Sequence, residues 1–200
     1  MFDHESLKRA SAKYITTLHD ASRDDKNQKY MVDSTVKAVN VDQMMKDYVK
    51  ALPLQDGRPR SVDAMVEKAD GTECLIEFKN GNVSKDEVLN KLYATLLMFQ
   101  DDYGLPVEYA RQHISFVLVY NREKYGGRGA ATNDPKRRVN QAPGFGNIQN
   151  SVMGRSKDTI VRHPKHIRGI GNSVEGIFVR DCNLCDKSDF DAVIQRVISA

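Results

Sequence analysis

The stretch SVDAMVEKADGTECLIEFKNG, residues 61–81, constrains the fold of this chain more than any other segment. Its two apolar runs flank Asp70-Gly71, a typical turn signal, so the stretch is predicted to form a β-hairpin of the protein core. Three charged residues, Asp63, Glu77 and Lys79, nevertheless stand within these runs. Charged residues are seldom placed in a core without a partner or a role, so their arrangement needs an explanation.

The register of the hairpin decides whether the charges meet, because a shift of one residue exchanges the two faces of a strand. A two-residue turn would scatter them. A three-residue loop that ends in a left-handed Gly71 instead sets Asp63 opposite Glu77 and Ala64 opposite Ile76. We expect this second register, because it sorts the apolar residues onto one face and the charges onto the other.

The two faces follow from the alternation of side chains along a strand. Glu77 and Lys79 are predicted to share a face with Leu75. The apolar set of the first strand is expected to face the other way: Val62, Ala64 and Val66.

Two carboxylates on neighbouring strands can act together on a metal ion. Paired Cβ atoms lie about 4.5–5.5 Å apart, so Asp63 and Glu77 are close enough to share one Mg²⁺ ion. Lys79 could then orient or help deprotonate a metal-bound water, and the metal would stabilise charge on a phosphate under attack. This chemistry suits hydrolysis of a phosphodiester.

The rest of the chain reads as one α/β domain of 200 residues, in which helices flank a mixed sheet. Residues 1–55 are predicted to hold two helices, one from Ser6 to about His19 and one over the apolar run between Val36 and Val49. The motif-bearing core spans 60–120. In it a capping box, Ser84-Lys-Asp-Glu87, begins a long helix that Gly104-Leu-Pro106 ends. The apolar run at 113–120 is typical of a buried strand.

The part after the core begins with a long basic excursion, residues 122–168, and continues with a final strand and helix over 174–198. The strand is expected at 174–179, and Ser188-Asp-Phe-Asp191 is expected to cap the helix.

The hairpin resembles the signature of the PD-(D/E)xK nuclease superfamily, in which an acid on one strand precedes Glu77-Phe78-Lys79 on the next. The resemblance covers roughly residues 30–120, and Val62 stands where the family name has proline. It implies a restriction-endonuclease-like α-β-β-β-α-β core, in which Asp63 and Glu77 bind Mg²⁺ or Mn²⁺ and Lys79 serves the nucleophile. An acid from the amino-terminal helix often completes such sites, and Glu5 is the candidate here. Lys91, on the helix after the motif, is a further candidate.

The basic excursion is the feature that points to a nucleic acid. From Arg122 to Arg168 the sequence has 11 Lys or Arg against three acidic residues. Such segregation is typical of a surface that binds a polyanion, although a solvated loop has the same composition. The candidate phosphate contacts are Arg128, Lys136, Arg137, Arg138, Arg155, Arg162, Lys165 and Arg168.

A structural zinc site is the alternative use of the carboxyl-terminal part. His163 and His166 form one pair with ligand-like spacing, and Cys182 and Cys185 form another. The same cysteines could instead pack in the core, and the histidines could contact phosphate.

The functional hypothesis from the sequence is a Mg²⁺-dependent nuclease that acts on DNA or RNA. No apolar stretch approaches the roughly 18 residues of a membrane span, and the amino terminus lacks a secretory pattern, so we expect a cytoplasmic protein. The alternative is a catalytically silent nuclease fold that binds a protein partner, as an immunity or accessory factor. The three charges could also be a structural ion-pair cluster. The oligomeric state stays open.

Overall fold

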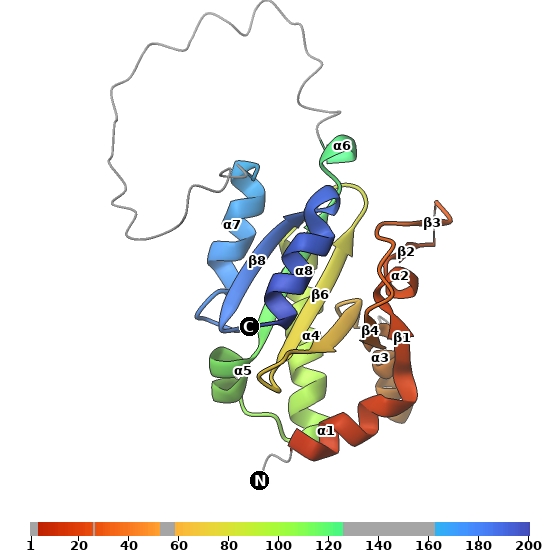
Figure 1. Cartoon of the computed structure of the whole chain (residues 1–200). Coiled ribbons are helices and arrows are strands. Elements are labelled where there is room, and N and C mark those ends of the chain that lie inside the picture. Colours follow the sequence, from red (N-terminus) through yellow and green to blue (C-terminus); the bar gives the residue numbers. More distant parts are fainter. Residues whose placement is uncertain (1–3, 26, 53–58, 126–162) are drawn as a thin grey trace, which may run out of the picture.

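A mixed sheet of six strands organises the protein, in the spatial order β1-β4-β5-β6-β7-β8 (Figure 1). The computed structural model describes residues 4–25, 27–52, 59–125 and 163–200. Neighbouring strands from β1 to β6 run antiparallel, whereas β6, β7 and β8 run parallel. The strands are β1 (Ile15–Thr17), β4 (Lys37–Asn40), β5 (Ala64–Glu67), β6 (Glu73–Lys79), β7 (Ser115–Tyr120) and β8 (Asp181–Asp186). The predicted mixed α/β class is confirmed.

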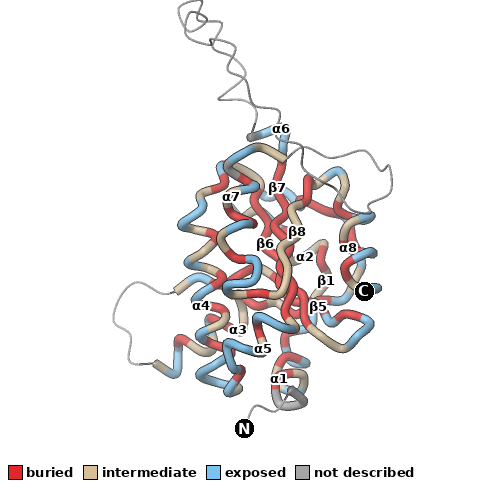
Figure 2. Tube along the Cα trace, turned by 90° about the vertical axis from the view of Figure 1, so that its left-hand side faces the viewer, coloured by how far each residue is buried: buried red, intermediate tan, exposed pale blue. Residues whose placement is uncertain are grey.

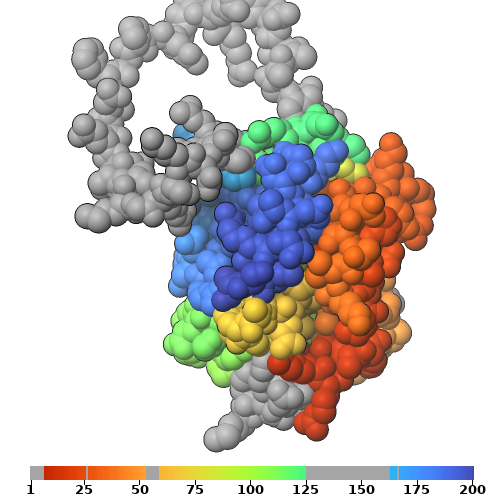
Figure 3. Space-filling view, viewed as in Figure 1, coloured from red at the N-terminus to blue at the C-terminus, as the bar shows by residue number. Residues whose placement is uncertain are grey.

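Helices cover both faces of this sheet, and its strands form the buried interior (Figure 2). One face carries α1 (His4–Ser11), α3 (Val41–Ala51), α4 (Lys85–Tyr103), α5 (Val107–His113) and α7 (Lys165–Val174). The other face carries α2 (Leu18–Ala21) and α8 (Phe190–Ile198). On that second face α8 lies beside the amino-terminal segment (Figure 3), and Phe190 and Ile194 share a core cluster with Leu18 and Met31.

The shorter elements lie at the margins of these layers. They are the 3-10 helices at Ala12–Tyr14 and Lys187–Asp189, α6 (Arg122–Tyr125), and the two-stranded sheet of β2 (Arg23–Asp24) and β3 (Lys29–Tyr30). Among the described residues, no helix combines the length and apolar character needed to cross a membrane.

The hairpin adopts the predicted register. Ala64 pairs with Ile76 across β5 and β6, and the Lys68 amide donates to the Thr72 carbonyl at 2.8 Å, which closes the three-residue loop. Gly71 has a φ of 80°, the left-handed conformation that this loop requires. Glycine tolerates this conformation because it has no Cβ.

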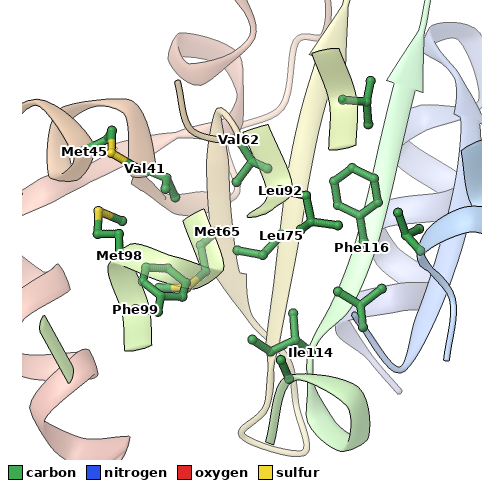
Figure 4. Close-up of a cluster of buried hydrophobic side chains, with 14 of the residues drawn as sticks. Val41, Met45, Val62, Met65, Leu75, Leu92, Met98, Phe99, Ile114 and Phe116 are labelled. Carbon is green, nitrogen blue, oxygen red and sulfur yellow. The ribbon is translucent and has the colours of Figure 1, made fainter. Parts of the chain in front are cut away.

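Val62 departs from the predicted faces. It is fully buried in the cluster that contains Met65, Leu75 and Leu92 (Figure 4), not with Ala64 and Val66. The reason is that Val62 precedes the strand ladder, and its amide donates at 3.0 Å to the Thr95 hydroxyl of α4. The chain bends at residue 63 before β5 begins.

The helix and strand after the hairpin follow the predictions. The Ser84 side chain accepts a hydrogen bond from the Glu87 amide, and the helix ends at Gly104 with a φ of 66°. Leu92, Met98 and Phe99 of α4 pack on the sheet (Figure 4). All six residues of β7 are buried.

The prediction of one helix over residues 6–19 is wrong. Helix α1 ends at Ser11, and Ile15–Thr17 pairs with β4 as an edge strand. Ile15, Thr16 and Thr17 are β-branched, and such residues favour an extended backbone once a partner strand is present. The second predicted helix is also shorter than expected, because Lys37–Asn40 is β4 and the Asn40 side chain caps α3.

The prediction of a strand at 174–179 is wrong as well. Helix α7 ends at Val174, whose carbonyl accepts hydrogen bonds from residues 177–179 in a tight loop. The strand is β8, which follows it. The expected Ser188 cap is not formed: the Asp186 side chain caps the 3-10 helix at Lys187–Asp189 by accepting from the Ser188 amide, and α8 begins at Phe190 without a side-chain cap.

The left-handed glycine of the hairpin loop gives a stability prediction. Gly71→Ala is expected to lower the free energy of unfolding by about 1 kcal/mol, because an L-residue is strained in this conformation. No atom lies within 4 Å of the added Cβ, so backbone strain alone is tested. Gly81→Ala is the control, since Gly81 also has open space but no positive φ. Urea unfolding measures both; equal losses would contradict the prediction.

Candidate active site

Asp63, Glu77 and Lys79 meet between the sheet and helix α4. Glu77 and Lys79 come from β6, which lies between β5 and β7 in the sheet. Asp63 immediately precedes β5. The Glu77 side chain has no exposed surface, and those of Asp63 and Lys79 are 14% and 10% exposed. The structure therefore brings together the three residues that the sequence singled out.

Lys91 of α4 joins the two carboxylates. Its Nζ atom lies 3.0 Å from Asp63 Oδ1, 2.8 Å from Glu77 Oε1 and 3.0 Å from Glu77 Oε2. The side chain is only 12% exposed. An ammonium group in this position contacts both carboxylates at once.

The backbone fixes the second oxygen of Asp63. Its Oδ2 atom accepts a hydrogen bond from the Phe78 amide at 2.6 Å. The Asp63 amide itself donates to the Ile76 carbonyl at 3.1 Å. These two bonds hold the carboxylate against β6 beside Glu77.

Lys79 is held by a residue that the sequence did not assign to the site. Its Nζ atom lies 2.6 Å from Glu87 Oε1 and 3.2 Å from Glu77 Oε1. Glu87 was noted only as part of the capping box, because that motif explains a glutamate at the third helical position. A second residue missed by the sequence is Thr95, whose spacing on α4 matches the apolar stripe. Its hydroxyl donates to the Lys91 carbonyl and accepts from the Val62 amide.

The electrostatics of the site favour an added positive charge. Burial, and then the neighbouring Asp63, raises the pKa of Glu77 to about 8, and burial raises the pKa of Asp63 above its ordinary value. The Lys91 charge lowers the pKa of both acids. Although burial alone lowers the pKa of a lysine, the two carboxylates raise that of Lys91. The acids are thus incompletely neutralised, and a proton or cation would stabilise them.

The carboxylate oxygens of Asp63 and Glu77 are ligands that magnesium accepts, but two side chains do not complete its coordination shell. Glu77 Oε1 is buried, and the Nζ atoms of Lys91 and Lys79 lie 2.8 Å and 3.2 Å from it, but neither contact has the geometry of a hydrogen bond. Within the described ranges, no group of three or more His, Cys, Asp or Glu side chains is arranged to hold a metal ion. Magnesium usually takes one or two carboxylates and completes its shell with water and substrate phosphate, so the Asp63–Glu77 pair is a sufficient protein contribution.

The acid predicted from the amino-terminal helix, Glu5, stays a prediction. Glu5 lies in α1, and its side chain is outside the described residues. Helix α1 meets the far end of β5, where Lys8 contacts Glu67. Asp42 of α3 is an acid near the site, since after burial its charge also raises the pKa of Asp63. The Asp42 carboxylate accepts a hydrogen bond from the Ser61 hydroxyl at 2.7 Å.

A polar hollow adjoins the charged residues. Asp63, Lys79 and Glu87 line one side of it, and the segment that contains β2 and β3 lines the other. Asn80 donates to Asp24 of that segment at 2.9 Å. The hollow therefore offers a substrate access to Lys79 and Asp63.

The row of residues that contains Lys79 continues across the parallel strands. Lys79 pairs with Tyr120, and Tyr120 pairs with Asp186, so the three residues lie side by side at the carboxyl ends of β6, β7 and β8. The Tyr120 hydroxyl and His163 Nδ1 are 2.9 Å apart. Burial and the Arg122 guanidinium lower the pKa of His163. His163, named from the sequence as a zinc or phosphate ligand, thus lies beside the row that holds Lys79.

The cysteines do not form a ligand pair. Cys182 packs against the cluster under α4 and α7, whereas Cys185 belongs to the cluster on the other face. The reason is that both lie on a strand, where residues three apart point to opposite faces. Burial raises the pKa of each thiol to about 12. The His166 side chain lies outside the described residues.

Most of the predicted phosphate contacts also lie outside the described residues: Arg128, Lys136, Arg137, Arg138, Arg155 and Arg162. Lys165 and Arg168 are exposed on α7. Among the predicted phosphate contacts, these two are the ones that the structure describes.

Comparisons with family models, with curated proteins and with solved structures find no match to this chain. The geometry of the charged residues is therefore the basis for a proposed function.

Thr95 gives the prediction that tests how the site is positioned. Thr95→Val removes the acceptor of the Val62 amide, which is expected to lower the free energy of unfolding by about 1–3 kcal/mol because a buried donor loses its partner. Thr95→Ser keeps the hydroxyl and is expected to cost less than Thr95→Val. Chemical denaturation of the two variants checks the order. A larger loss in the serine variant would show that the methyl group, not the hydrogen bond, matters here.

Proposed function

We propose that the protein is a Mg²⁺-dependent nuclease of the restriction-endonuclease-like type, which hydrolyses phosphodiester bonds in DNA or RNA. The observation that carries the proposal is the buried group of Asp63, Glu77 and Lys79, whose acids are incompletely neutralised. Perturbed charges gathered beside an accessible hollow are typical of functional sites.

The order of the elements supports the proposal. An antiparallel β4-β5-β6 unit leads through α4 to β7, which is parallel to β6. The resemblance implies a helix, three strands, a helix and a further buried strand, in this order. The chain adds α3 between β4 and β5, and it extends the sheet with β1 and β8.

The residues would divide the chemistry among them. Asp63 and Glu77 would hold the magnesium ion, which supplies a more acidic water and stabilises charge on the phosphate. Lys79 Nζ, placed by Glu87 and Glu77, would donate a hydrogen bond to the attacking water and orient it. The Phe78 amide keeps Asp63 in place, so that the two acids stay side by side.

The substrate would be held by contacts to its phosphates. Lys165 and Arg168 are exposed on α7, which begins near the carboxyl ends of the parallel strands (Figure 1). The polar hollow gives access to Lys79. Phosphate contacts of this kind give affinity that falls with salt and carry little sequence preference.

A catalytically silent binding protein is the second candidate, and one observation favours it. The Lys91 ammonium already neutralises part of the charge of Asp63 and Glu77. If Lys91 never leaves, the three motif residues form a structural ion cluster within a scaffold that binds a protein partner.

Cleavage assays with variants of two motif residues test the nuclease proposal. The wild type is expected to cut single- or double-stranded DNA or RNA with Mg²⁺ or Mn²⁺. Glu77→Gln removes a metal ligand and Lys79→Met removes the orienting ammonium, so each is expected to lower the rate roughly hundredfold or more. Lys85→Met is the matched control, because Lys85 is exposed on the same helix as Glu87.

The assay also separates the two candidates. Circular dichroism must first show that every variant is folded. Loss of cleavage in the two motif variants, with activity kept in the control, supports the nuclease. A wild type that cuts none of the four substrates and binds neither metal would instead support the silent binding protein.

Salt dependence tests the proposed phosphate contacts. If Lys165 and Arg168 each contact one phosphate of a duplex, the double variant Lys165→Ala/Arg168→Ala should lower the slope of log affinity against log salt by about 1.8. Fluorescence anisotropy with a labelled duplex measures the slope. The control, Lys37→Ala/Arg196→Ala, removes the same charge from exposed positions on β4 and α8. An equal change in the control would show that only net charge matters.

A further inference from the structure

We infer that Lys91 is an internal counter-cation that competes with the metal ion for Asp63 and Glu77, and that it moves to Glu87 when the metal binds. This inference rests on the proposed function and names a step that regulates the same site. It assigns Lys91 the role of a positioning residue, not that of a group that reacts with the substrate.

The contacts of Lys91 place its charge where a shared metal would lie. The Nζ atom touches an oxygen of Asp63 and both oxygens of Glu77, at 2.8 to 3.0 Å. A magnesium ion approaches its oxygen ligands to about 2.1 Å. The Lys91 ammonium contacts three of the four oxygens of the Asp63–Glu77 pair, so it fills the space between the two acids and its charge repels a divalent ion there. Binding of the metal to both acids is therefore expected to displace it.

The remaining contacts show which group is free to move. Asp63 is fixed by the Phe78 amide, and Glu77 lies on a fully buried strand. Lys91 is anchored by its helix backbone, but its ammonium sits at the end of a flexible four-carbon chain. The lysine side chain can leave the site while the sheet and α4 stay in place.

Glu87 is the acceptor that the helix offers to a displaced Lys91. The two residues are four apart on α4, so their side chains lie on the same helix face. Both line a hollow that also contains Pro59 and Arg60, and the Glu87 side chain is 39% exposed. The hydrogen bond from Lys79 lowers the pKa of Glu87, and the Lys91 charge lowers it further, which supports the proximity of Lys91 and Glu87.

The exchange would also affect Lys79. Glu87 Oε1 holds Lys79 Nζ at 2.6 Å while Lys91 is between the acids. A second ammonium at Glu87 weakens that hold, because the carboxylate then shares its charge between two lysines. Metal binding and release of the orienting lysine would thus be linked through Glu87.

Metal titration without nucleic acid tests the competition. Isothermal calorimetry with Mn²⁺ is expected to show about tenfold tighter binding to Lys91→Met than to the wild type, since the ion no longer displaces a hydrogen-bonded ammonium. Lys85→Met removes the same charge from the exposed start of α4 and is expected to bind like the wild type. Equal or weaker binding by Lys91→Met would overturn the inference.

Labelling of the wild type tests the movement and needs no variant. Lys91 is 12% exposed, so an amine-specific reagent should modify it slowly without metal. Mass spectrometry is expected to show severalfold faster modification of Lys91 when Mn²⁺ is added, while Lys85 reacts at an unchanged rate. If the rate at Lys91 does not rise, Lys91 stays in place and the exchange is refuted, even where Lys91→Met binds metal more tightly. This measurement also decides the matter if the methionine variant does not fold.

The outcomes separate this inference from the nuclease proposal. Metal binding and cleavage by the wild type, with no rise in labelling, would leave the nuclease and remove the exchange. Metal binding by neither the wild type nor Lys91→Met would overturn the exchange and the magnesium site together.

Discussion

A carboxylate with no exposed surface, that of Glu77, lies between the sheet and α4. Transfer of such an ion out of water costs on the order of several kcal/mol, and only close opposite charges and hydrogen bonds offset that cost. Lys91 and Lys79 supply the charges, from the covering helix and from the same strand. The helix must therefore lie close to β6 at this point, and the packing of Leu92 and the bonds of Thr95 hold it there.

The topology places this buried charge at an accessible edge. Because α4 connects two parallel strands, β6 and β7 end on the same side of the sheet. The crevice outside the carboxyl ends of parallel strands is where ligands bind in open α/β sheets. Lys79 and Tyr120 lie in that row, and Glu77 lies two residues deeper in the same strand. A deep acid next to residues that line a polar hollow combines low solvation with access for a substrate.

The features predicted well from the sequence are those set by local chemistry. The hairpin register follows from the need for a left-handed residue in its loop, and glycine meets that need at residue 71. The long helix follows from the Ser84 cap and from Gly104. The charged face of β6 follows from strand alternation. Lys91 could be named as a candidate because it lies on the helix that follows this strand.

The features missed depend on contacts between distant segments. Ile15–Thr17 is only three residues long, and its apolar positions also fit a helix, so its pairing with β4 decides its structure. Glu87 has two roles: it belongs to the capping box of α4, and it contacts Lys79 of β6. The sequence reveals only the first. Val62 turns toward α4 because the hydroxyl of Thr95, more than 30 positions away, accepts its amide. Long-range hydrogen bonds of this kind leave no periodic signal.

The cost of the charged group is itself an argument for a role in binding. Apolar side chains of similar volume, in place of a buried ion pair, are often neutral or stabilising. A leucine at 77 and a methionine at 91 would fill the space between β6 and α4 without burying a charged group such as the Glu77 carboxylate. Stability alone therefore does not account for two acids and two lysines in this layer. The proposed exchange of Lys91 for a metal ion would account for them, because such an exchange needs buried, incompletely neutralised acids and a lysine side chain that can leave them.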